Sequence, residues 1–347
     1  MTAKNERHRA GDGPDDSAPR QGDLLVRALI DDGAARLVIA VATGVAREAA
    51  RRHDAGPAAA VAMGRAATAG LLLATLTKDD ERVTLQLLGK GPLGTLTVDA
   101  GSGGTARVFV TNPRFAMQGS GAAATRVGDA VGRSGVVNVV RDLGPGHDFS
   151  GQTPIIDGEI DTDVEHYLCQ SEQIDSALAC EARLDQRGGI RLAVGVLVQA
   201  LPNNQTGTLR GFPYPPATTP LGKAEWSSRD LGARVVAEAR ARLRAGALHA
   251  LPDDPDIATI IEAALGDSAS EARVLPGELP LRFHCPCSRE RAAATLALLG
   301  EEDLLALIRE EGEADVTCEF CRAHYAFTDA ALEGIRQGIR RDIGPPS

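Results

Sequence analysis

The chain has 347 residues, a length that predicts about two domains. Hydrophobic residues make up 43% and charged residues 24%, a composition that excludes a collagen-like or wholly disordered chain. The 37 basic and 47 acidic residues give a net charge of −10, which argues against a sequence-independent nucleic-acid binder, because such a protein needs a basic footprint.

The first 22 residues contain no apolar segment, so we predict a disordered tail over 1–22 and no secretory signal. The longest uncharged run covers 192–209 and is interrupted by Pro202 and the polar residues that follow it, so we expect no membrane-spanning helix. We therefore expect a cytoplasmic protein without a membrane partner, whose cysteines are normally reduced.

Strand and helix patterns alternate over residues 23–202. A hairpin turn is predicted at Asp31-Asp32-Gly33, and a helix break is predicted near Gly56-Pro57. Strands are predicted at 23–30, 35–42, 83–88, 95–98, 106–110, 136–142, 176–185 and 190–201, and helices at 44–77 and 158–173. This mixture predicts an α+β fold in which mixed β-sheets are covered by helices.

Residues 203–280 differ from the preceding part. Four prolines within 203–222 predict a long surface loop. A helix is predicted over 223–251, followed by a second short helix that starts at Asp254-Pro255 and ends at Gly266. The apolar residues expected to face a core are Leu231, Val235, Ala239 and Leu243 in the first helix, and Ile257, Ile260, Ile261, Ala264 and Leu265 in the second.

The helical segment should be weakly stable unless it is docked on something else. Residues 253–278 contain seven acidic residues and one basic residue, Arg273, and short helices with small apolar faces are marginal in water. We expect Trp226, the sole tryptophan, to anchor the start of this segment against the N-terminal part of the chain.

The six cysteines are unevenly spaced. Cys169 and Cys180 stand apart in mid-chain and are predicted to be small buried residues. The other four form two short arms, Cys285-Pro-Cys287 and Cys318-Glu-Phe-Cys321. Four thiolates from two short arms suit tetrahedral zinc, and a unit as small as 281–341 has little core, so a metal would supply much of its folding energy.

The spacing alone leaves a passive structural zinc site and a redox-responsive zinc site open. Each arm can close on itself as a local disulfide, and an oxidised thiolate no longer holds zinc well, so oxidation would eject the metal. His284 and His324 flank the arms and are alternative ligands, and Arg289 and Arg322 can offset the negative charge of a four-thiolate centre.

Residues 285–327, CPCSRERAAATLALLGEEDLLALIREEGEADVTCEFCRAHYAF, resemble the zinc-binding end of the bacterial 33 kDa heat-shock, redox-regulated chaperone family. Other segments are similar to this family in the same order: GKGPLGTLTVDA (89–100), VRDLG (140–144), FSG (149–151), GEIDTDVEHYLCQSEQ (158–173) and LVQALP (197–202). The resemblance spans about residues 23–341.

The resemblance implies a division into a chaperone core at 23–202, a Pro-rich loop and helical redox-sensitive linker at 203–280, and a zinc redox-switch domain at 281–341. It implies an ATP-independent holdase that is inactive while Cys285, Cys287, Cys318 and Cys321 bind one zinc ion. Oxidation then forms the disulfides Cys285–Cys287 and Cys318–Cys321, releases zinc and unfolds the linker. The activated protein, a homodimer, binds unfolding client proteins and prevents their aggregation under stress.

The alternative function is a zinc-ribbon interaction or nucleic-acid-binding module on an α/β domain. The net charge of −10 and the aromatic content of 3% weigh against it, so no nucleic-acid partner is expected. An enzyme is not expected, because no convincing acid, base or nucleophile set is present. The Gly89-Lys90-Gly91 triplet lacks the spacing of a phosphate-binding loop and predicts a turn between strands.

Overall fold

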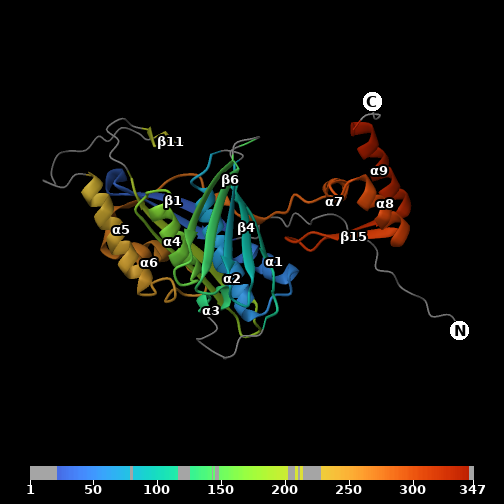
Figure 1. Ribbon diagram of the computed structural model, residues 1–347. Helices are drawn as coiled ribbons and strands as arrows, with labels where there is room; N and C mark the ends of the chain where they lie inside the picture. The colour runs from blue at the N-terminus through green and yellow to red at the C-terminus, as the bar shows by residue number, and fades with distance from the viewer. Residues whose placement is uncertain are drawn as a thin grey trace. The chain divides into compact units, whose positions relative to one another are not determined.

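A computed structural model describes residues 22–78, 81–115, 126–142, 144, 148–201, 208–209, 212–213 and 228–343. The predicted tail up to residue 21, most of the Pro-rich loop and Trp226 lie outside these described residues. The described chain forms two compact units, one that ends at Phe283 and one that starts at His284 (Figure 1).

The first sheet of the larger unit has the strand order β12-β1-β2-β9-β8, with β13 also paired to β1. Its long strands are β1 (Leu24–Ile30), β2 (Ala35–Val41), β8 (Ser176–Leu184) and β9 (Ile190–Ala200), as the sequence predicts. The predicted hairpin turn between β1 and β2 is present as the short 3-10 helix η1 (Asp31–Gly33). Strands β12 (Ala272–Val274) and β13 (Leu279–Pro280) were not predicted, and they add a distant segment to the edge of this sheet.

The second sheet has the order β14-β5-β4-β3-β6-β7. The predicted strands are β3 (Arg82–Gly89), β4 (Thr95–Gly101), β5 (Thr105–Val110) and β6 (Gly135–Asp142), which pair antiparallel. Two strands were not predicted, the edge strand β7 (Asp148–Pro154) and the two-residue β14 (Arg282–Phe283), which pairs parallel with β5.

A helical layer lies between the two sheets. Its members are α1 (Thr43–Arg52), α2 (Pro57–Ala74) and α4 (Ile160–Gln170), and α1 and α2 are separated at Gly56-Pro57 as predicted. The short helix α3 (Gly128–Val131) contacts β3 of the second sheet. Helix α2 contacts β8 and β9 of the first sheet and β4 and β5 of the second. Its length and apolar composition alone would suit a membrane span, but 89% of it is buried within the fold, so α2 is a core helix in this structure.

The opposite face of the first sheet is covered by α5 (Ser228–Arg244) and α6 (Ile257–Leu265), here called the linker helices (Figure 1). Val235, Ala239 and Leu243 of α5 and Ile260, Ile261, Ala264 and Leu265 of α6 are buried in one cluster with side chains of β1, β2, β8 and β9. The marginal segment foreseen from the sequence is therefore docked, which supplies the burial that its short helices lack.

Several boundaries in this segment differ from the prediction. Helix α5 ends at Arg244, and turns occupy 245–250 where the helix was expected to continue. Helix α6 is capped by Asp256, whose carboxylate accepts a 2.7 Å hydrogen bond from the Thr259 N–H, and not by Asp254. Within the predicted loop at 203–222, β10 (Thr208–Leu209) and β11 (Phe212–Pro213) form a small hairpin.

The smaller unit comprises α7 (Arg289–Ala297), α8 (Glu301–Glu310), the hairpin of β15 (Glu313–Thr317) and β16 (His324–Thr328), and α9 (Asp329–Ile343). Its core cluster contains five buried residues, Ala292, Leu296, Leu304, Phe327 and Leu332. A core of this size gives little stability by itself, so this unit needs a further source of cohesion.

Candidate metal centre

The two cysteine arms are placed by well-defined local structure. Cys285 and Cys287 lie immediately before α7, whose first turn is capped by Ser288 through a 3.2 Å hydrogen bond from the Arg291 N–H to its hydroxyl. Cys318 and Cys321 lie in the turn between β15 and β16. The Cys318 N–H donates to the Ala323 carbonyl at 2.9 Å, and this closes the second arm into a tight loop.

The fold brings the four sulfur atoms together. All four lie within 4.8 Å of one another, with 3.7 Å between Cys285 and Cys318 and 3.2 Å between Cys287 and Cys321. A tetrahedral zinc ion with Zn–S bonds of about 2.3 Å separates its sulfur ligands by about 3.8 Å. The donor set therefore fits a tetrahedral metal ion bound by thiolates. All the donor atoms that the described residues bring to this group are cysteine sulfurs.

Crowding makes these thiols difficult to ionise without a cation. The pKa of Cys321 is raised, first by hydrogen bonding with Cys285 and Cys318 and then by burial. The pKa of Cys318 is also raised, chiefly by its hydrogen bond with Cys285. A divalent cation held by these four residues would reverse this effect, because a cation stabilises thiolates and favours loss of their protons.

Tyr325 supports the centre from β16. Its hydroxyl donates a 3.1 Å hydrogen bond to the sulfur of Cys287, and its pKa is raised by burial and then by this hydrogen bond. Partners of this kind orient ligands and tune their donor strength. This role was not predicted from the sequence, because the position of Tyr325 four residues after the last cysteine does not show which sulfur its hydroxyl contacts.

The histidines and arginines that flank the cysteine arms have contacts with residues other than the four cysteines. The Arg289 guanidinium lies 4.4 Å from the centroid of the Phe327 ring, and Arg322 pairs with Glu319 at 3.6 Å. The His324 ring lies 3.4 Å from the Thr317 hydroxyl, and neither His324 nor His284 belongs to the group of donor atoms.

The remaining candidates lie in the larger unit. Cys180 is buried, and burial together with the charge of Asp161 raises its pKa, which keeps the thiol protonated. Cys169 is half-buried on α4. The Lys90 N–H donates to Ser134 at 3.1 Å and the Gly91 N–H to Val131 at 2.8 Å, so this predicted turn has its backbone donors occupied and does not form a phosphate loop.

The fold and the cysteine group together define an α+β protein with a small C-terminal unit built around four clustered thiols. A family model described as Hsp33 protein matches residues 23–328. The chain is 32% identical over 319 residues to the 33 kDa chaperonin of Bacillus subtilis (strain 168), covering 92% of this chain and 100% of the relative. It is 36% identical over 321 residues to the 33 kDa chaperonin of Gloeobacter violaceus, covering 92% and 97%.

The structural comparison agrees with these matches. The crystal structure of the 33 kDa chaperonin (heat shock protein 33 homolog) of Thermotoga maritima superposes with a TM-score of 0.74 at 26% identity, over 92% of this chain and 99% of that chain. The chain belongs to the Hsp33 family of chaperones.

Proposed function

We propose that this protein is a redox-regulated, ATP-independent holdase chaperone that is inactive while reduced and zinc-bound. The observation that carries the proposal is the group of four sulfurs within 4.8 Å, in a unit whose core cluster has five buried residues. Cys285, Cys287, Cys318 and Cys321 would hold the ion, and the bound ion would supply the cohesion that this small core lacks.

Oxidation would remove the thiolates that hold the ion. Each pair of thiolates gives two electrons to one molecule of hydrogen peroxide, which takes up two protons and leaves as two water molecules. Two molecules of peroxide thus convert the four thiolates into two disulfides, which we propose to be Cys285–Cys287 and Cys318–Cys321. Disulfide sulfurs are poor metal donors, so the small unit loses its metal and its fold.

The linker helices connect this event to client binding. Their buried side chains cover an apolar face of the first sheet that includes Ile30, Leu37, Ile39, Val196 and Val198. Residues 253–278 contain seven acidic residues and one basic residue, so mutual repulsion disfavours their compact state once docking is lost. Release would expose a contiguous apolar surface of the kind that binds unfolded chains.

The other assignments in this proposal follow the family. The core at 23–202 would bind clients, 203–280 would be the redox-sensitive linker, and 281–341 would be the switch. We infer that the protein acts in the cytoplasm during oxidative stress and forms a homodimer when oxidised. The net charge of −10 supports a role without a nucleic-acid partner.

The test compares reduced and peroxide-treated protein in three measurements: zinc content, disulfide mapping, and suppression of the aggregation of a thermally unfolding client without ATP. We expect one zinc ion per reduced chain, its loss on oxidation, and suppression by the oxidised form alone. A Cys169→Ser variant is the control and should behave like the unaltered protein. Reduced protein without zinc, or equal suppression by both forms, would refute the proposal.

A further inference from the structure

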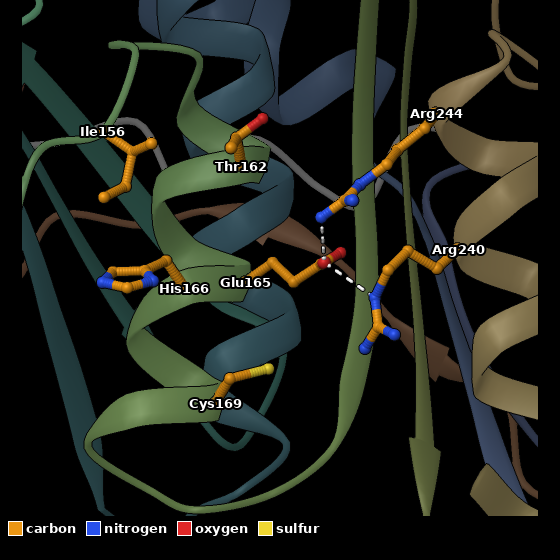
Figure 2. A pocket seen from close by; sticks show the side chains of 7 residues that line it. All are labelled: Ile156, Thr162, Glu165, His166, Cys169, Arg240 and Arg244. Carbon is orange, nitrogen blue, oxygen red and sulfur yellow. Dashed lines mark hydrogen bonds and ion pairs between the residues drawn. The ribbon is translucent and has the colours of Figure 1, made fainter.

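Glu165 is a buried carboxylate whose cationic partners both come from a linker helix. It lies on α4, and its side chain is 8% exposed. One carboxylate oxygen, Oε2, accepts a 2.9 Å hydrogen bond from the Leu178 N–H of β8. The other, Oε1, accepts from Arg240 Nε at 3.0 Å and from an Arg244 terminal nitrogen at 2.9 Å. Figure 2 shows the carboxylate directed toward these two guanidinium groups of α5.

Arg240 is the more firmly held of the two cations. Besides Glu165 it donates to the Asp175 carboxylate at 2.6 Å and to the Ser176 carbonyl at 2.8 Å. Burial alone would lower the pKa of Arg240, but hydrogen bonds and ion pairs with Asp175 and Glu165 outweigh it, and the pKa is raised. Its side chain is 24% exposed, against 67% for Arg244.

The shared oxygen makes the contact depend on charge rather than on shape. Two guanidinium groups within hydrogen-bond distance of one atom repel each other, and the negative charge of Glu165 turns that repulsion into attraction. A neutral side chain of the same size would take from Arg244 its carboxylate partner in this contact and would leave Arg240 with Asp175 alone, so the repulsion between the two cations would be less compensated. The contact would then hold α5 to the core more weakly, through the bonds of Arg240 with Asp175 and Ser176.

The apolar contacts of α5 do not depend on whether the side chain at position 165 is charged or neutral. Val235, Val236 and Ala239 are small and pack on a broad sheet face, where burial is non-directional. The charged cluster is directional and sits at one flank of the helix.

We propose that Glu165 is the core residue that retains α5, and that it thereby sets the oxidant or heat exposure at which the linker segment, residues 228–278, is released. The proposal rests on the proposed function in one respect, that release of this segment activates the chaperone. The retention of α5 by Glu165 is a property of the folded chain and can be measured without any chaperone activity.

The first experiment uses Glu165→Gln in the full-length, reduced, zinc-loaded protein. Hydrogen exchange over 228–244 should show an opening equilibrium raised by about tenfold or more, with unchanged zinc content. The matched control is Glu238→Gln on α5, because Glu238 is an exposed carboxylate that pairs with Arg234 within the same helix at 3.0 Å and accepts a hydrogen bond from Ser268 of the same linker segment at 3.2 Å. Its effect should stay within about twofold.

The second experiment tests whether charge or packing retains α5. The test is whether the effect of Arg244→Gln on the opening equilibrium changes sign between two backgrounds. Arg244→Gln should raise opening in the unaltered protein, because it removes an attraction to Glu165. In the Glu165→Gln background the same substitution should lower opening, because it removes one of two repelling cations. Arg234→Gln takes the same charge from α5 and should show no such reversal.

The outcomes are decisive. Unchanged exchange in Glu165→Gln, or an Arg244→Gln effect of the same sign in both backgrounds, overturns the inference. If Glu165→Gln fails to fold by circular dichroism, Arg240→Gln tests the same contact from the α5 side and should raise opening at least as much as Arg244→Gln. A smaller effect overturns the inference.

The dose of peroxide that gives half-maximal aggregation suppression should fall in Glu165→Gln. If released protein never suppresses aggregation while the exchange results hold, the proposed function fails and the role of Glu165 stands. If suppression occurs at an unchanged peroxide dose in Glu165→Gln, the proposed function stands and the claim that Glu165 sets the oxidant exposure for release fails.

Discussion

The hydroxyl of Tyr325 lies 3.1 Å from the sulfur of Cys287 and donates a hydrogen bond to it. This bond joins β16 to the arm that precedes α7, so each cysteine arm is connected to the other by a contact besides any shared metal. A donor to a ligand sulfur stabilises the thiolate and fixes its position.

Tyr325→Phe should therefore weaken metal binding without removing a ligand. We expect the zinc affinity of the reduced protein to fall by about tenfold or more, as measured by competition with a chromogenic chelator. Tyr167→Phe is the matched control, because Tyr167 is buried in the larger unit and donates to Glu172 at 2.7 Å. Equal affinities for Tyr325→Phe and the unaltered protein would show that the hydrogen bond has no part in metal binding.

Loss of one thiol should unfold the smaller unit. In Cys318→Ser, or after chelation of the unaltered protein, amide protection over 284–343 should collapse, because five buried core residues do not hold this unit without a metal. Hydrogen exchange and limited proteolysis measure the effect. Cys169→Ser should keep both protection and metal, and a Cys318→Ser protein with full protection would contradict the expectation.

Disulfide mapping after peroxide should find Cys285 bonded to Cys287 and Cys318 bonded to Cys321. Proximity does not select this pairing, since cross-arm sulfurs approach to 3.7 and 3.2 Å. We expect loop closure to favour this pairing, because closing a short local ring costs the least conformational entropy. Peptides that show mainly cross-arm bonds, or a Cys169–Cys180 bond, would reject the pairing.

Ile260→Ala should weaken the apolar contacts between the linker helices and the first sheet. Ile260 is fully buried in the cluster with the first sheet, and removing its side chain should destabilise the docked segment by about 2–4 kcal/mol. We expect faster hydrogen exchange over α6 and aggregation suppression at lower peroxide doses. Val274→Ala, at a side chain that is 47% exposed, is the control and should leave both quantities unchanged.

Asp163 should give the folding stability a specific pH dependence. Its carboxylate accepts hydrogen bonds from the Ile156 and Gly158 N–H groups at 2.7 and 3.1 Å, yet burial, assisted by the charge of Asp157, raises its pKa from 3.8 to about 6. Between these values the folded chain carries a proton that the unfolded chain has lost. Its contribution to the free energy of unfolding therefore falls as the pH rises from about 4 to about 6.

Urea unfolding at several pH values tests this expectation against Asp163→Asn. The stability of the unaltered protein minus that of the variant should decline across the window and level off above it. A difference that grows with pH would mean that the folded-state pKa of Asp163 lies below its ordinary value.

The elements that depend on patterns among neighbouring residues are predicted correctly from the sequence. The strands around Asp31-Asp32-Gly33 and the break before Pro57 follow from alternation and turn chemistry in neighbouring residues. Strand β7 was missed because its sequence, DFSGQTP, has no hydrophobic alternation, and its place is decided by pairing with β6. Strands β12 and β13 were missed because their partner, β1, lies more than 200 residues earlier.

The same difference between local and long-range determinants applies to the candidate site. Cysteine spacing identified the four residues whose sulfurs the fold brings together, while their role as zinc ligands and their disulfide pairing stay predictions. The contact of Tyr325 with Cys287 depends on the packing of β16 beside the first arm, and that of Glu165 with Arg240 joins residues 75 positions apart. No local pattern encodes either contact.

The position of α2 between the two sheets bears on recovery after stress. The contacts of α2 with β8 and β9 use the sheet face opposite to that covered by the linker helices: Gly195 approaches Thr68 and Leu72 of α2, while Val194 and Val196 face α5 and α6. Strands β1, β2, β9 and β8 would thus keep their register when the linker helices depart. Such a sheet would be a ready template, so return to the resting state would require the re-folding of the linker segment and the smaller unit and not of the whole chain.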